Sequence, residues 1–383
     1  MSNINFIHRD KCSICQGELE DIYTIPDFPI YMGVNHSDRS ETCDLIYCTC
    51  KLCRTLQIRN LIPLDILYEN NHNTDIVGNL WKNHYKQFSS FIFDDIDIPN
   101  TILEIGDPAC KLAQSNKGRS FNKWIIVEPT DLCNSFDRVH HIKDVLNSSF
   151  DIKKYTLDPV DVVIFSHSFE HMYNPFEVVQ KITEVIKDGG HLFISLPDMD
   201  YIAEYGLVPF NCLTFEHTVF LNPDIIEYLF QNNFSFDGIE YYKNHSIFFK
   251  LKKQSNNKNN ISNTEIAKIN SSYNILFEDT IRNIFGYINT VNEKIESIDS
   301  YYVYGAHIST QFLLKLGINP TKILGILDNS EMKIGKVLYG TPYKVFSPSI
   351  LKDGTFYVLC NVGAFTPEIK SDLLKINKNI VFI

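Results

Sequence analysis

Residues 101–110 read Thr-Ile-Leu-Glu-Ile-Gly-Asp-Pro-Ala-Cys, an apolar run that ends at a glycine. Such a run predicts a buried strand, and Gly106 lets the backbone approach a ligand closely at the carboxyl end of that strand. The next apolar run, Trp124–Val127, ends in Glu128, 22 residues after the glycine. An acidic side chain at about this distance can accept hydrogen bonds from both ribose hydroxyls of an adenosine cofactor. The two strands therefore predict an adenosine-binding site, and NAD satisfies the same geometry.

Apolar runs continue to alternate with helical patterns further along the chain. Val160–Phe165 and His191–Leu196 predict two more buried strands, and Phe176–Ile186 between them has helical spacing. The glycines in Lys187–Gly190 predict the end of that helix. An amphipathic helix is also predicted ahead of the first strand, over residues 76–92. Alternating strands and helices indicate a parallel sheet with helices on both faces.

Six of the ten cysteines lie in the first 53 residues. They include two Cys-x-x-Cys pairs, Cys12/Cys15 and Cys50/Cys53, which offer the four thiolates that tetrahedral Zn²⁺ takes. Ordinary buried cysteines are the alternative interpretation. Cys48 competes with Cys50 as the third ligand, and we keep Cys50 because it completes the second pair. Four protein ligands close the coordination sphere, so we expect the zinc to be structural.

The overall composition limits the possible functions. A length of 383 residues favours two or three domains, and a formal net charge of -11 argues against non-specific nucleic-acid binding. Neither a signal peptide nor a membrane-spanning run is apparent, so a cytoplasmic protein without a membrane partner is expected. The sequence leaves a monomer and a homodimer both open.

Changes in composition divide the chain into four segments. We expect a zinc-binding domain over residues 1–70, a cofactor-binding domain over 71–252, a polar linker over 253–263 and a C-terminal α/β domain over 264–383. The last segment begins with a long helical pattern and continues with a second βαβ pattern. Its predicted elements are a helix over Thr264–Ile298 and strands at Tyr301–Tyr304, Ile323–Leu327, Phe356–Leu359 and Ile380–Ile383.

The motifs around the first sheet resemble those of class I methyltransferases. The turn 103–106 is similar to their first motif, Glu128 to their ribose acid, and residues 161–175 and 188–195 to their fourth strand and the turn and strand that follow. The resemblance implies S-adenosylmethionine as the cofactor and a Rossmann-like α/β fold. The residues that it implies for cofactor binding are Glu104, Gly106, Glu128, Pro129, Asp144, Ser166 and His167.

The order of the segments resembles a narrower family, the sugar C-methyltransferases that act on nucleotide-linked 4-keto-deoxyhexoses. Residues 214–223 are similar to the stretch rich in His and acidic residues of that family, and Tyr304-Gly305-Ala306, 328–335 and 340–342 are similar to patches of its C-terminal domain. The resemblance implies a second Rossmann-like domain that binds the nucleotide sugar. Its implied substrate-binding residues are Tyr304, His307 and Lys333.

C-methylation beside a ketone needs a base that removes the α-proton. His217 is our candidate, since the ordinary pKa of a histidine near 6.5 suits proton transfer, with Glu216 orienting the ring or binding a sugar hydroxyl. The sequence departs from the family where the substrate would bind. Thr214 stands where the family has a tyrosine, and the family's Tyr-x-Tyr patch is replaced at residues 68–73 by Tyr-Glu-Asn-Asn-His-Asn. His72 is therefore an alternative catalytic contact.

These departures keep several functions open. The leading hypothesis is methyl transfer to carbon of a nucleotide-linked keto sugar. O- or N-methylation of another small molecule or surface sugar is the alternative within enzymes. An inactive nucleotide-binding scaffold is less favoured because Glu104, Gly106 and Glu128 are present, and NAD chemistry is disfavoured because the second glycine of its fingerprint is missing.

Overall fold

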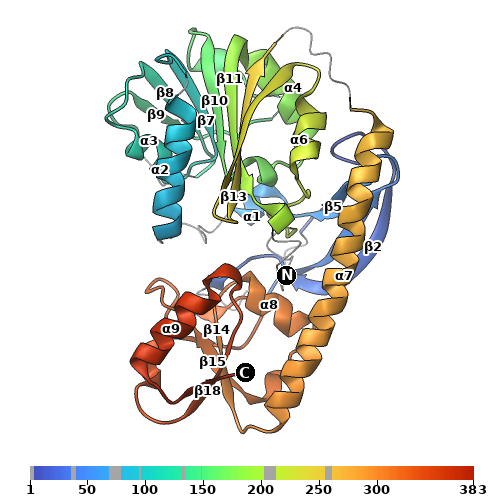
Figure 1. The fold of residues 1–383 in the computed structure, drawn as a ribbon, viewed down its shortest axis with the longest axis vertical. Coiled ribbons are helices and arrows are strands. Elements are labelled where there is room, and N and C mark those ends of the chain that lie inside the picture. The colour runs from blue at the N-terminus through green and yellow to red at the C-terminus, as the bar shows by residue number, and fades with distance from the viewer. Residues whose placement is uncertain are drawn as a thin grey trace.

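The computed structural model describes residues 4–35, 40–68, 79–94, 96–130, 134–147, 149–201, 213–254 and 261–383. A central α/β unit lies above a second α/β unit in Figure 1, and the N-terminal strands and one long helix run beside both. In this part of the chain, no helix combines the length and apolar character that a membrane span requires.

The central sheet has seven strands in the order β12-β13-β11-β10-β7-β8-β9. Neighbouring strands from β9 to β11 are parallel, whereas β13 is antiparallel to both β11 and β12. The predicted Rossmann-like α/β fold is confirmed, with a mixed and mostly parallel sheet. Its strands are β7 (Thr101–Ile105), β8 (Lys123–Val127), β9 (Val139–Ile142), β10 (Val160–Ser166), β11 (Ile186–Pro197), β12 (Phe234–Tyr242) and β13 (Ser246–Lys253).

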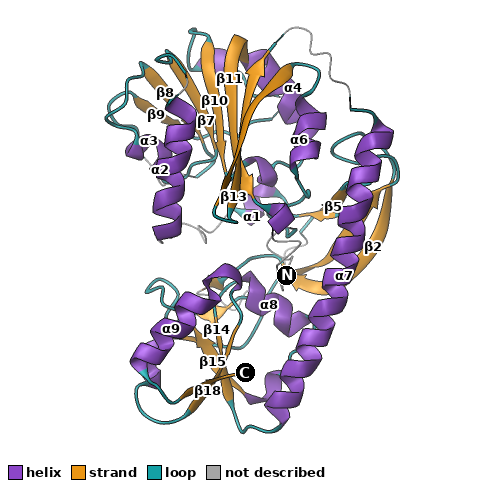
Figure 2. Ribbon diagram, viewed as in Figure 1, coloured by secondary structure: helices purple, strands orange, loops and turns teal. Residues whose placement is uncertain are grey.

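Helices cover both faces of this sheet because successive strand residues point to opposite sides. On β7, Ile102 packs with α2 and α3, whereas Leu103 packs with α4 and α6. Figure 2 shows these helices on either side of the strands. They are α2 (Asn79–Phe93), α3 (Lys111–Ser115), α4 (Pro175–Val185) and α6 (Pro223–Phe230).

The glycines predicted to end the helix over 176–186 lie inside β11 instead. Val160 on β10 pairs with Ile186, and regular pairing resumes only at His191. Gly189 has a φ of +75°, which lets the intervening residues leave and rejoin the ladder. The glycine pair therefore forms an irregularity near the start of β11. This strand begins at Ile186, five residues before the predicted start at His191.

The strand order reverses between β7 and β10. The chain leaves β7 through β8 and β9, then returns to place β10 on the other side of β7. Open α/β sheets bind ligands at such a point, beyond the carboxyl ends of the strands. Gly106 follows β7 and Ser166 ends β10, so both lie at this edge.

The N-terminal segment is a set of antiparallel strands wedged against both α/β units. The Phe28 ring lies 4.5 Å from the Phe312 ring and 6.2 Å from the Phe215 ring. The order of its main sheet is β2-β4-β5, and β3 pairs with β16 of the C-terminal unit. Its elements are β1 (Ile7–His8), β2 (Leu19–Pro29), β3 (Val34–Asn35), β4 (Thr42–Cys50), β5 (Leu56–Ile58), β6 (Asn60–Leu61) and α1 (Leu64–Leu67).

The C-terminal unit follows α7 (Asn263–Glu296), a 34-residue helix that begins with a capping box of Ser262 and Glu265. All neighbouring strands of its sheet, in the order β17-β15-β14-β18-β19, are parallel. The elements are β14 (Tyr301–Tyr304), α8 (Ile308–Lys315), β15 (Ile323–Leu327), β16 (Val337–Leu338), β17 (Val345–Phe346), β18 (Phe356–Cys360), α9 (Thr366–Ile376) and β19 (Ile380–Phe382).

Candidate active site

The turn after β7 requires glycine. Gly106 has a φ of +78°, and its N–H donates to the Val127 carbonyl at 3.0 Å. A Cβ at this position would lie 2.6 Å from the Cβ of Ser168. Ser168 is itself held by a 2.5 Å hydrogen bond from its hydroxyl to the Ile105 carbonyl. The backbone of the loop after β7 thus packs directly against Ser168 of the loop after β10, at the point where the strand order reverses.

Glu104 lies under this turn, in the interior of the sheet. It is fully buried, and the Trp124 indole donates to its Oε2 at 2.9 Å. Its other oxygen has no hydrogen-bond partner among the described residues. Burial raises the pKa of this carboxyl well above its usual range. The observed contact of Glu104 is therefore with Trp124, and its predicted contact with the cofactor stays a prediction.

Glu128 lies at the carboxyl end of β8, where the ribose acid is predicted. It is buried, and its Oε1 accepts hydrogen bonds from the N–H and the hydroxyl of Thr130, both at 2.9 Å. Pro129 between them is half-buried. Burial raises the pKa of Glu128, and the Thr130 donors oppose that rise. Oε2 accepts no hydrogen bond from the described residues.

Asp144 follows β9 at the same edge. Its Oδ2 accepts from the Tyr155 hydroxyl at 2.8 Å and its Oδ1 from the Val145 N–H at 2.8 Å. Both oxygens thus have protein partners, and the predicted contact with an adenine amine stays a prediction.

Ser166 is the last residue of β10, and His167 follows it. The Ser166 hydroxyl is buried without a hydrogen-bond partner among the described residues. His167 has a φ of +51°, and its Nε2 lies 2.8 Å from the Ser246 hydroxyl. Its ring packs against Trp81 at 4.8 Å between centroids. His167 thus joins the β10 edge to the β12–β13 hairpin.

Two Glu-His pairs meet beside this edge. Glu170 and His171 follow β10 in a short 3₁₀ turn, and Glu216 and His217 precede α6. The His171 and His217 rings lie 4.7 Å apart and almost perpendicular, at 81°. Both glutamates are buried, with 1% of Glu170 and 3% of Glu216 exposed. The predicted base is therefore one member of a cluster of buried carboxyl groups and half-buried imidazole rings.

Tyr68 brings the N-terminal segment into this cluster. Its hydroxyl lies 3.2 Å from His171 Nδ1. The pKa of this phenol is raised well above its usual range, by burial first and then by nearby acidic groups that include Glu216, Glu128 and Glu170. Tyr68 thus lies within electrostatic reach of both the Glu-His pairs and the predicted ribose acid.

Tyr68, Glu170 and His171 are the residues of this arrangement that sequence reasoning did not single out. A signal for two of them exists in the chain: the tripeptide Phe-Glu-His occurs at 169–171 and again at 215–217. The alternative contact His72 lies outside the described residues.

Comparison with known proteins decides the family of this region. Residues 49–237 match a family model described as a methyltransferase domain. This is a class I methyltransferase domain. The protein is accordingly an S-adenosylmethionine-dependent methyltransferase, as predicted. The match includes the Gly106 turn, Glu128 and both Glu-His pairs.

Solved methyltransferase structures resemble the chain at low sequence identity. The N-methyltransferase NodS of Bradyrhizobium japonicum WM9 in complex with S-adenosylhomocysteine is 9% identical with a TM-score of 0.37, over 49% of this chain and 94% of that chain. The 1,6-didemethyltoxoflavin-N1-methyltransferase of Burkholderia thailandensis is 10% identical with a TM-score of 0.37, over 46% and 82%. A search of curated proteins finds no match.

Four cysteines of the methyltransferase converge next to its central domain. Sγ of Cys12 lies 3.6 Å from Sγ of Cys53, and Sγ of Cys15 lies 3.5 Å from Sγ of Cys50. Thiolates around a tetrahedral Zn²⁺ stand roughly 3.8 Å apart. Backbone N–H groups and the Gln57 amide donate to the sulfurs, as thiolates require. The donor set therefore fits a zinc ion.

Cys48, the alternative ligand, is not part of this four-cysteine cluster. Its thiol donates instead to the Gln57 carbonyl at 3.3 Å. The two Cys-x-x-Cys turns are each followed by a residue with positive φ, Gln16 and Arg54. A Cβ at Gly17 would lie 2.9 Å from Sγ of Cys50, so the first turn also needs glycine there.

The C-terminal unit of the methyltransferase has a similar glycine turn after β14. Gly305 has a φ of +104°, and Asp328 Oδ2 accepts from the Ala306 N–H at 2.9 Å and from Lys333 Nζ at 3.2 Å. Tyr304 is buried in the core, and His307 is the N-cap residue of α8. Of the three predicted substrate residues, Lys333 thus stabilises the turn through Asp328, and the Tyr304 side chain packs in the core.

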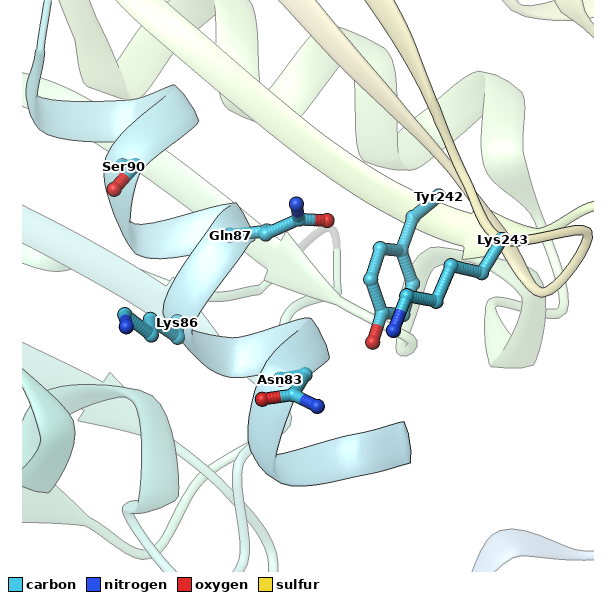
Figure 3. Close-up of a pocket in the computed structure, with 6 residues that line it drawn as sticks. All are labelled: Asn83, Lys86, Gln87, Ser90, Tyr242 and Lys243. Carbon is cyan, nitrogen blue, oxygen red and sulfur yellow. The ribbon is translucent and has the colours of Figure 1, made fainter. Parts of the chain in front are cut away.

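A surface pocket of about 330 Å³ lies away from these groups, between α2 and the β12–β13 hairpin. Gln87 points across it toward Tyr242 and Lys243 in Figure 3. Tyr242 is anchored by a hydrogen bond to the Leu80 carbonyl at 2.8 Å. The pocket includes none of the predicted site residues.

Proposed function

We propose that this methyltransferase methylates a carbon atom next to the ketone of a nucleotide-linked 4-keto-deoxy sugar. The observation that carries the proposal is that His217 lies within 4.8 Å of the buried carboxylate of Glu170, beside the carboxyl ends of the parallel strands. A carbon acid needs a positioned base, whereas many O-methylations need only orientation. The motif resemblance supplies the sugar class.

His217 would remove the α-proton of the ketone and become an imidazolium. The enolate carbon then forms a bond to the sulfonium methyl group, while the bond between that methyl and sulfur breaks. The products are the methylated ketone and S-adenosylhomocysteine, and the imidazolium returns its proton to water. Glu216 would hold a sugar hydroxyl or the imidazole ring in position.

S-adenosylmethionine supplies the electrophilic methyl group. We expect the cofactor to approach the backbone at Gly106, and its ribose to bind at Glu128 and Pro129. Asp144 would lie near the adenine. Ser166 and His167 would contact the cofactor at the end of β10. Glu104 would act from below the turn through Trp124. The support is their shared edge at the topological switch point.

We also propose Zn²⁺ as the occupant of the four-cysteine cluster of Cys12, Cys15, Cys50 and Cys53. With four protein ligands the ion would stabilise the fold and take no part in the reaction. Residues 264–383 would bind the nucleotide sugar through Tyr304, His307 and Lys333. The domain division at 70, 252 and 263 belongs to the same proposal.

O-methylation of another small molecule is the second candidate, and Thr214 favours it. Where the sugar family has a tyrosine, the Thr214 hydroxyl accepts from the N–H groups of Glu216 and His217, at 3.1 and 3.2 Å. That position therefore holds the loop in shape. His217 would then take the proton of a hydroxyl.

Isotope exchange separates the two candidates. The purified protein is incubated with a panel of nucleotide keto sugars in deuterated water without cofactor. If the acceptor is carbon, the parent enzyme should exchange the α-proton. His217→Ala should abolish this exchange and slow methylation by about 10²–10⁴-fold, while cofactor binding persists. Methylation of a panel member without exchange would move the acceptor to oxygen, and a fully active His217→Ala enzyme would remove His217 as the base.

A further inference from the structure

We propose that Glu170 is a positioning residue whose buried carboxylate stabilises the positive charge on His217 when that histidine takes a proton. The inference rests on the proposed function for the identity of the base. It assigns a role to a side chain that is separated from His217 in the sequence by α4 and β11 and lies close to it in space.

Glu170 is buried without compensation by hydrogen bonds. Only 1% of it is exposed, and neither carboxylate oxygen has a hydrogen-bond partner among the described residues. A buried carboxylate in this state is costly unless positive charge lies close by. The groups that face it are histidines: His167 Nδ1 lies 3.4 Å from its Oε1, and ligand atoms of His171 and His217 lie within 4.8 Å.

The electrostatics of the cluster point the same way. Burial raises the pKa of Glu170, but His167, His171 and His217 outweigh it, so that the pKa is lowered overall. Among the described residues, the buried phenol of Tyr68 also interacts electrostatically with Glu170. Glu170 thus remains a carboxylate, and its charge is neutralised best when a neighbouring ring is protonated.

A divalent metal could also use this site, with Glu170, His171 and His217 as its ligands. A proton on an imidazole needs only a nearby negative charge. Metal binding is therefore the competing outcome of the test.

The test measures the titration of the His217 ring signals by NMR in the full-length protein without substrate. Signals are assigned by their loss in His217→Gln. In Glu170→Gln the midpoint should fall by about 1–3 pH units, the effect of removing a charge at this range. Glu170→Asp should restore part of it, and Glu177→Gln, an exposed neighbour on α4, should change nothing.

An unchanged midpoint in Glu170→Gln would overturn the proposal, as would binding of a second equivalent of Zn²⁺ or Mn²⁺ that Glu170→Gln abolishes. If Glu170→Gln does not fold, Glu170→Asp decides, since an unchanged midpoint there has the same consequence. Because no sugar is present, a wrong substrate assignment leaves this result unaffected. In a methylation assay, the acidic limb of the pH–rate profile should shift with the midpoint.

Discussion

Gly106 and Ser168 meet where the first strand of the methyltransferase sheet ends. Any Cβ at residue 106 faces both a positive φ and a contact of 2.6 Å. The side chain of Ser168 cannot withdraw freely, because its hydroxyl is bound to the Ile105 carbonyl. The two loops of the cofactor edge are thus fixed relative to each other by a single small residue.

Gly106→Ala should therefore destabilise the protein and weaken cofactor binding together. We expect a loss of about 1–3 kcal/mol in the free energy of unfolding, the scale for a non-glycine residue in this backbone region. Denaturant unfolding measures it. Gly118→Ala is the matched control, since a Cβ there meets open space. Equal stability of the two variants would contradict the steric account.

Glu128→Ala should weaken S-adenosylmethionine binding by about 1.5–3 kcal/mol, the scale for a charged hydrogen-bond partner. The reason is that one of its oxygens is bound to Thr130, whereas the other accepts no hydrogen bond from the described residues and would bind the ribose hydroxyls. Calorimetry on folded protein gives the value. Unchanged affinity, or a preference of the parent for NAD, would count against this residue as the ribose acid.

At the scale of elements, α2 and the β12–β13 hairpin are joined through histidines. His84 on α2 is buried with its Nε2 2.9 Å from the Ser195 hydroxyl, and its ring lies 5.9 Å from that of His245. Burial, followed by the charge of His167, lowers the pKa of His245 to about 3, and burial lowers that of His84 further. This packing needs neutral rings.

The stability of this packing should therefore fall in acid. Unfolded histidines titrate near 6.5, so between that pH and about 3 the unfolded chain binds more protons at His245 than the folded chain does. The free energy of unfolding should decrease as pH drops through this window. Urea unfolding from pH 7 to 4 tests it, and His245→Asn should flatten the dependence. An identical slope in that variant would rule out His245 as its source.

At the scale of the whole molecule, the four-cysteine cluster connects segments far apart in sequence. Asn270 on α7 donates to the Cys53 carbonyl at 2.8 Å, and Asn274 donates to the Arg54 carbonyl at 3.0 Å. Cys12, Cys50 and Cys53 share an apolar cluster with Ile266 of that helix. The helix continues into the C-terminal unit, where Ile284 and Ile288 pack with its sheet.

Cys50→Ser should abolish stoichiometric zinc, whereas Cys48→Ser should keep one ion per chain, as metal analysis would show. Loss of the ion should raise hydrogen exchange in β2, β4 and the first half of α7, because these contact the cluster, and leave β7 and β10 protected. Zinc-free parent protein, or loss of zinc in Cys48→Ser alone, would refute the ligand assignment.

The fold of the central domain was largely readable from local patterns. Apolar runs predicted β7, β8, β10 and the second half of β11, because a strand buried on both faces needs continuous apolar residues. The boundary at 186–190 was wrong, since glycines that usually end a helix here form an irregularity within a strand. Local glycine chemistry alone does not distinguish these two cases.

By itself the sequence determined the α/β class, the methyltransferase motif order, the two cysteine pairs and His217 as a candidate base. The fold class and the cysteine pairs follow from periodicity and spacing, which are properties of neighbours along the chain, whereas the motif order and His217 follow from the family resemblance. Only the tertiary structure decided that Tyr68, Glu170 and His171 join His217, and that Cys50 rather than Cys48 faces the other thiols. Such groupings depend on which strand edges and faces meet, and no local pattern carries that information.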